Sequence, residues 1–156
     1  MLKKIYFTFY FLLTAFLVNS QVVINEYSAS NFDSHPDNYG EYEDWVELYN
    51  TTNSDIDLNG WSLTDKPSSL NKWSFPGSFI VSANSVAIVY CSGLNELVGG
   101  VAHTNFKITQ TKAGEVFVLS DAGGNIIDSA RAVPAQKSHS RGRDVNGGTT
   151  WSVFTT

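Results

Sequence analysis

The chain has 156 residues, and its 15 aspartates and glutamates outnumber its 10 lysines and arginines, giving a net charge of −5 at pH 7. This acidic balance argues against a general binder of polyanions or of anionic membrane surfaces. The single cysteine, Cys91, has no partner for an intrachain disulfide, so the fold must be stabilised by packing.

The first twenty residues have the pattern of a secretory signal peptide. Lys3 and Lys4 precede an apolar run over residues 5–18, and a polar exit ends at Ser20. The run is short for a membrane span and no positive flank follows it, so we expect export with cleavage after Ser20; an uncleaved anchor is the alternative. Without Lys3 and Lys4, eight basic residues face fifteen acidic ones. Residues 21–156 are then expected to form one domain of net charge −7 that does not insert into a membrane.

The rest of the chain consists of short segments in which polar and apolar residues alternate, separated by turn residues. The predicted strands are 22–27, 44–49, 56–58, 61–64, 72–75, 79–82, 85–91, 103–108, 115–120, 125–130 and 151–154. Residues 93–100 are expected to form a loop with one helical turn at 94–97. Strands that follow one another without helices favour an antiparallel all-β fold, namely a β-sandwich, with a barrel as the alternative.

Large apolar side chains on these segments are the expected core, because each buried tryptophan removes a large apolar area from water. In 44–49, alternation places Val46 and Leu48 on one face and Trp45 on the other. The predicted core residues are Trp45, Val46, Leu48, Trp61, Leu63, Trp73 and Trp151. Cys91 closes the apolar run 86–91 and is expected to be a buried filler rather than a reactive thiol.

Several motifs occur in an order that resembles a known family. The two most specific are Trp45-Val46-Glu47-Leu48 with Asn50, and Leu58 with Gly60-Trp61, Leu63 and Asp65. They are accompanied by Val23-Ile24-Asn25-Glu26-Tyr27, Trp73-Ser74-Phe75-Pro76 and Ser140-Arg141-Gly142-Arg143-Asp144 with Gly147, Gly148 and Trp151. With these motifs, residues 21–156 resemble the lamin tail domain family, found in nuclear lamins and in many exported bacterial proteins. The resemblance implies an immunoglobulin-like sandwich that binds or scaffolds without catalysis. The Thr-Pro-Gly segment and the hydrolase domain of many bacterial members are not found here.

An acidic segment between the first two predicted strands is the candidate metal site. Carboxylates and loop carbonyls are the ligands that calcium prefers. The calcium candidates are Asp33, Asp37, Glu41, Glu43 and Asp44. Their spacing matches no regular calcium loop, and a solvated acidic surface needs no metal, so no cofactor is expected.

Catalytic chemistry is not indicated. The chain has three histidines, His35, His103 and His139. No serine has a nucleophile-elbow setting, and one cysteine with scattered histidines does not supply three zinc ligands. Glu26 and Glu47 lie on predicted strands, where pairing with loop backbone or with Arg141 or Arg143 is expected rather than acid–base work.

Two further features are candidates for function: the basic segment 131–143 for nucleic-acid binding and one sequon for glycosylation. Export and the acidic total argue against a nucleic-acid patch, and Arg143-Asp144 before a Gly-Gly turn is expected to be a locally neutralised corner. Asn50-Thr51-Thr52 has the form of a glycosylation sequon, but it also fits a strand-ending corner.

These patterns predict a non-catalytic, adhesion-like module outside the cytoplasm that binds a protein or a surface polymer and no nucleic acid. Its partner is expected at the loops of one end or at an edge strand that extends another chain's sheet. The predicted strand 151–154 is the candidate edge. The alternative is an accessory domain, truncated at residue 156, that tethers a secreted hydrolase or another multidomain surface protein. An enzyme would need a convergent pocket of perturbed groups.

Overall fold

The computed structural model describes residues 21–109, 114–134 and 136–155, which form strands and turns without a helix. The all-β class predicted from the sequence is confirmed. The strands are β1 (Val22–Ser28), β2 (Trp45–Asn50), β3 (Ile56–Asp57), β4 (Ser62–Thr64), β5 (Trp73–Ser74), β6 (Ile80–Val81), β7 (Val86–Tyr90), β8 (Glu96–Val98), β9 (Val101–His103), β10 (Val116–Ser120), β11 (Ile126–Arg131), β12 (His139–Arg143) and β13 (Trp151–Thr155).

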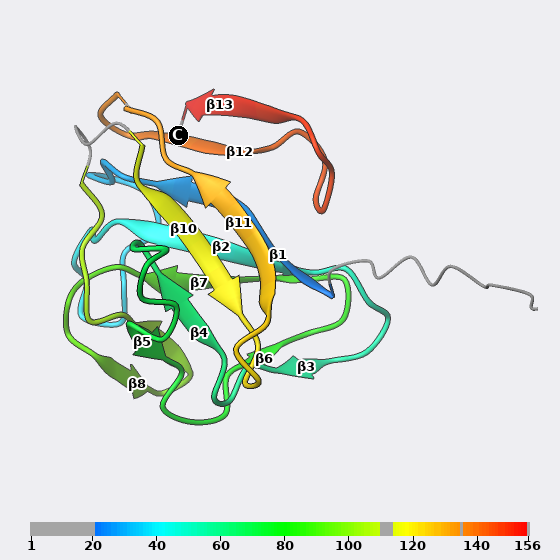
Figure 1. Cartoon of the computed structure of the whole chain (residues 1–156). Helices are drawn as coiled ribbons and strands as arrows, with labels where there is room; N and C mark the ends of the chain where they lie inside the picture. Colours follow the sequence, from blue (N-terminus) through cyan, green and yellow to red (C-terminus); the bar gives the residue numbers. More distant parts are fainter. Residues whose placement is uncertain (1–20, 110–113, 135, 156) are drawn as a thin grey trace, which may run out of the picture.

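Two sheets face each other across one core (Figure 1). The larger has the strand order β13-β12-β1-β2-β7-β9-β8, the smaller has the order β11-β10-β4-β5, and β3 and β6 form a separate pair. Neighbouring strands are antiparallel except β7 and β9. Because each sheet has two edges, the architecture is the expected sandwich and not a closed barrel.

Side chains on the two inner faces form the core. Alternation along β2 directs Val46 and Leu48 inward, and both are fully buried. Phe75 packs against Trp73 and Phe79, with ring centroids 4.6 Å and 5.1 Å apart. Burying aromatic rings of this size contributes about 2–3 kcal/mol each relative to leaving them exposed.

The four tryptophans occupy three kinds of position. Trp73 lies in the core, whereas Trp61 and Trp151 are partly buried and pack against its margin. Trp45 is also buried, with 1% of its surface exposed, but it lies on the outer face of the larger sheet. Cys91 is a free thiol in the core, and burial raises its pKa well above its ordinary value.

Two segments differ from the sequence-based expectation. The helical turn expected at 94–97 is wrong: residues 96–98 form β8, because the tight turn at Gly99 and Gly100, both with positive φ, folds β8 back onto β9. The strand expected over 103–108 is also displaced. β9 ends at His103 because the Thr104 hydroxyl donates to the Phe106 carbonyl, a local turn that competes with the sheet ladder.

A polar clasp joins the two sheets near β1. The Asp128 carboxylate of β11 accepts hydrogen bonds from the Ile24 N–H (2.8 Å) and from Arg143 Nη2 of β12 (2.9 Å). Arg143 also donates from Nε to the Ile24 carbonyl (2.9 Å) and from Nη1 to the Gly148 carbonyl. The basic corner predicted at Arg143 is therefore neutralised by Asp128 of the other sheet.

Candidate functional site

The acidic segment 32–43, which we call the acidic loop, lies over the outer face of the larger sheet. The rings of His35 and Trp45 meet edge-on with centroids 5.2 Å apart, and the Tyr90 hydroxyl donates to the Pro36 carbonyl at 3.0 Å. Trp45 and Tyr90 are cross-strand neighbours on that face. The loop is thus packed on the sheet, and it covers Trp45.

Three of the five calcium candidates, Asp37, Glu43 and Asp44, have separate protein partners, and the other two are exposed. Asp37 Oδ1 accepts the N–H groups of Tyr39 (2.8 Å) and Glu41 (2.9 Å), which makes a local turn. Glu43 pairs with Lys107 at 3.0 Å, and Asp44 Oδ1 accepts the Asn31 N–H at 3.1 Å, while the side chains of Asp33 and Glu41 are exposed. Within the described residues, no three His, Cys, Asp or Glu side chains are grouped closely enough to hold a metal ion. These five residues stay candidates, and no calcium site is assigned to them.

Two carboxyl groups have raised pKa values. Burial raises the pKa of Asp44 to about 6, against the opposing effect of its hydrogen bond from Asn31. Burial also raises the pKa of Glu47, which accepts a hydrogen bond from Asn25 Nδ2 at 2.8 Å. A carboxyl group that titrates near neutrality specifies no reaction without a nucleophile or a second acid beside it.

A serine, a histidine and an asparagine form a hydrogen-bonded array that sequence reasoning missed. The Ser92 hydroxyl lies 2.9 Å from His103 Nδ1, and His103 Nε2 lies 2.8 Å from Asn38 Oδ1. The His103 side chain is completely buried and Ser92 is 5% exposed, so a substrate has no route to either. Because Asn38 belongs to the acidic loop, the array fastens this loop to the sheet rather than activating a nucleophile.

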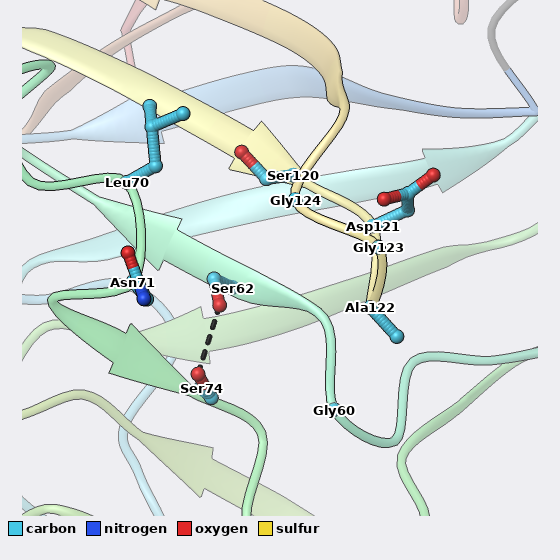
Figure 2. A pocket seen from close by; sticks show the side chains of 10 residues that line it. All are labelled: Gly60, Ser62, Leu70, Asn71, Ser74, Ser120, Asp121, Ala122, Gly123 and Gly124. Carbon is cyan, nitrogen blue, oxygen red and sulfur yellow. Dashed lines mark hydrogen bonds between the residues drawn. The ribbon is translucent and has the colours of Figure 1, made fainter.

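A polar hollow of about 350 Å³ lies on the outer face of the smaller sheet (Figure 2). Ser62 and Ser74 share a hydrogen bond of 2.8 Å on its floor, and the turn from Asp121 to Gly124 forms one side. Both Asp121 carboxylate oxygens accept hydrogen bonds from Asn125, which lower its pKa. Among the described residues that line the hollow there is no histidine, lysine or arginine, so it offers hydroxyl groups and the Asp121 carboxylate but no acid–base pair.

The paired glutamates do not bind either arginine. Glu26 and Glu47 face each other across β1 and β2, and the Glu26 stem packs against Gly142, where a Cβ atom would lie 2.7 Å from Glu26 Cγ. Glu47 is held by Asn25, and Arg143 by Asp128. The expected structural role therefore has different partners from those predicted.

The sheet edges differ in what they offer to another chain. β5 and β8 have two and three residues, too few for an extended pairing surface. At the end of β11, the Tyr27 hydroxyl donates to the Arg131 carbonyl (3.3 Å) and accepts the Val133 N–H (3.1 Å), which occupies the edge. β13 has five residues and, in the described part of the chain, pairs on one side only.

The register of β12 and β13 shows which backbone groups face outward. The Asp144 N–H donates to the Thr150 carbonyl at 3.0 Å, and hydrogen-bonded pairs alternate in an antiparallel ladder. The backbone groups of Ser152 and Phe154 therefore bond to β12, whereas those of Val153 point to the open edge. The Val153 side chain is 62% exposed and that of Phe154 37%.

A groove runs beside this edge. The inner face of the β12–β13 hairpin extends past β11, the outermost strand of the smaller sheet (Figure 1). Two hollows of about 390 Å³ and 310 Å³ lie along it, and both include Val133 and Arg141 in their lining. Trp151 borders the first hollow and Val153 the second. The candidate functional site is the edge of β13 with this groove.

Comparison with known proteins identifies the family. The model of the lamin tail domain matches residues 18–133. The chain belongs to the lamin tail domain family. The matched region runs from β1 to the segment after β11, so β12 and β13 of this lamin tail domain lie outside it. A search of the curated proteins found no match.

Membership of the lamin tail domain family indicates the class of function. Lamin tail domains are immunoglobulin-like, non-catalytic protein-interaction modules. The Ser92–His103–Asn38 array and the hydroxyl-lined hollow are accordingly read as structural features of such a module. None of the described residues forms a helix long and apolar enough to cross a membrane.

Proposed function

We propose that this lamin tail domain is an extracytoplasmic protein-binding module whose partner adds a strand to the open edge of β13. The observation that carries the proposal is the outward direction of the Val153 backbone groups on a five-residue edge strand. Unpaired N–H and C=O groups in a row are a template for an extended segment of another chain.

Two further features support this proposal. Val153 and Phe154 are exposed apolar residues on opposite faces of β13, so a bound strand would find an apolar neighbour on each face. The apolar run at 5–18, preceded by Lys3 and Lys4, supports export and an extracytoplasmic partner.

The test uses a photo-crosslinking residue placed on β13 in the exported chain. We expect the label at Phe154 to give a discrete adduct, and the same label at Leu94, a 52% exposed residue away from β13, to give none. Val153→Pro removes the outward N–H and should abolish the adduct, whereas Val153→Ala should keep it. Equal adducts at Phe154 and Leu94, or no adduct from Phe154, would refute strand addition at β13.

A further inference from the structure

Two arginines on the same face of β12 have different surroundings. Arg143 is paired with Asp128 and bonded to two carbonyl groups. Arg141, two residues earlier, has no ion pair or side-chain hydrogen bond within residues 21–109, 114–134 and 136–155; its charge lies 5.9 Å from the centre of the Trp151 ring. A guanidinium group held over a ring and left without an anion can bind a carboxylate with two hydrogen bonds.

Arg141 points into the groove beside β13. It pairs in register with Tyr27 on one side and with Val153 on the other, so all three share the inner face of the sheet. Tyr27 is buried in the core, but Arg141 lies beyond β11 and lines both hollows of the groove. A strand that pairs with β13 would direct alternate side chains onto this same face, next to Val153 and within the reach of Arg141.

The charge around the groove is opposite to that of the chain as a whole. Residues 129–143 contain four basic residues, Arg131, Lys137, Arg141 and Arg143, and no aspartate or glutamate, in a chain of net charge −5. Because Arg143 is already paired with Asp128, the excess positive charge comes from the other three. Arg131 lines the first hollow with Arg141. If two copies paired through β13 around a two-fold axis, these basic faces would meet and repel, so an acidic segment fits better than a second copy.

We propose that the groove selects an extended partner segment in which acidic and apolar residues alternate. The acidic side chains lie on the inner face and bind Arg141, and the apolar side chains lie on the outer face beside Phe154. This inference rests on the proposed function, because it names the chemistry of the strand that β13 would bind.

The experiment compares two blocked peptides of about eight residues, one alternating glutamate with valine and one alternating lysine with valine, titrated into the isotope-labelled chain. We expect the glutamate peptide to shift the amide signals of residues 151–155 and the Trp151 indole signal, and the lysine peptide to shift neither. Arg141→Glu should weaken binding of the glutamate peptide about tenfold or more. Raising the salt concentration should weaken it as well.

Lys66→Glu is the matched control, because it makes the same charge change at an exposed residue outside the hairpin and should leave the affinity unchanged. Equal binding of both peptides, an unaltered affinity in Arg141→Glu, or no binding of the glutamate peptide would overturn the inference. So would a dimer that forms through β13 without peptide. Strand addition itself would survive these outcomes if the Phe154 adduct still depends on Val153.

Discussion

Asn50 shows how much of the fold depends on one polar side chain. It ends β2 fully buried, and its Nδ2 donates to the carbonyls of Ser54 (2.7 Å) and Val81 (2.9 Å). Its Oδ1 accepts the Thr52 N–H (2.9 Å) and the Thr52 hydroxyl (2.8 Å). The sequon at 50–52 is thus a strand-ending corner, and the folded chain gives no access to its amide nitrogen.

Asn50→Ala should lower the free energy of unfolding by about 2–4 kcal/mol, because it leaves buried carbonyl and amide groups without partners. Asn53→Ala, at an exposed neighbour in the same corner, should cost about 1 kcal/mol or less. Urea denaturation of both variants measures the difference. Equal losses would contradict the central role of Asn50 in the corner.

Asp44 gives the stability a pH dependence whose sign follows from its raised pKa. The folded chain holds the Asp44 proton up to about pH 6, whereas in the unfolded chain the proton is lost near the ordinary value of 3.8. Stability should therefore fall as pH rises from 4 to 6, and the loss persists above 6. Asp44→Asn should raise the midpoint of thermal unfolding at pH 7.5 and weaken this dependence. A variant less stable than the parent at pH 7.5 would contradict the assignment.

At the scale of elements, the acidic loop is fastened by His103 of β9. The ring stacks on Tyr90 and contacts the tilted ring of Tyr39, with centroids 5.5 Å and 5.8 Å away, in addition to its hydrogen bonds to Ser92 and Asn38. His103→Ala should increase hydrogen exchange at residues 37–41 while leaving β10 and β11 protected. Uniform loss of protection over the whole chain would show that His103 supports the sandwich rather than the loop.

Because of the register of β12 and β13, we expect proline to destabilise the hairpin by different amounts at two adjacent residues. Phe154→Pro removes an N–H that bonds to β12 and should destabilise the hairpin by about 3 kcal/mol, whereas Val153→Pro removes an outward N–H and should cost about 1 kcal/mol or less. Chemical denaturation of the two variants tests the register. The reverse order would show that the open edge has been assigned to the wrong residues.

Elements with a clear period or turn were predictable from the sequence, and elements defined by their neighbours were not. Alternation located β2 and the hairpin of β10 and β11, where Gly124 adopts the positive φ that the turn needs. The sequence does not indicate β12, because Ser140 and Gly142 are small and the alternating arginines have the pattern of an exposed segment. The partner that buries Arg143 is Asp128, which belongs to the other sheet. The array around His103 joins residues 65 positions apart, a distance that no local pattern reports.

For the whole molecule, the clasp of Asp128 and Arg143 links the two sheets. The two side chains are 17% and 10% exposed, so each charge depends on the other for compensation. Asp128→Ala should cost about 3 kcal/mol or more, because it removes the counter-charge of Arg143 and leaves the Ile24 N–H without an acceptor, while Asp121→Ala, in an exposed turn, should cost much less. A double-mutant cycle with Arg143→Ala that shows no coupling would contradict the clasp.

Export is the other prediction at the scale of the whole chain. We expect the chain to be recovered outside the cytoplasm with Gln21 as its first residue, because the apolar run at 5–18 ends in a small-residue exit at Ser20. Cell fractionation followed by N-terminal sequencing measures this. A cytoplasmic chain that still begins at Met1 would contradict the proposed extracytoplasmic role.

Hydrogen exchange at the backbone of β13 shows whether a partner strand pairs with the open edge. In the free chain, we expect slow exchange at Ser152 and Phe154 and fast exchange at Val153, because only the first two bond to β12. Once the partner strand is bound, Val153 should become as protected as its neighbours. A Val153 amide that is protected before binding, or that stays unprotected in the complex, would contradict strand addition at this edge.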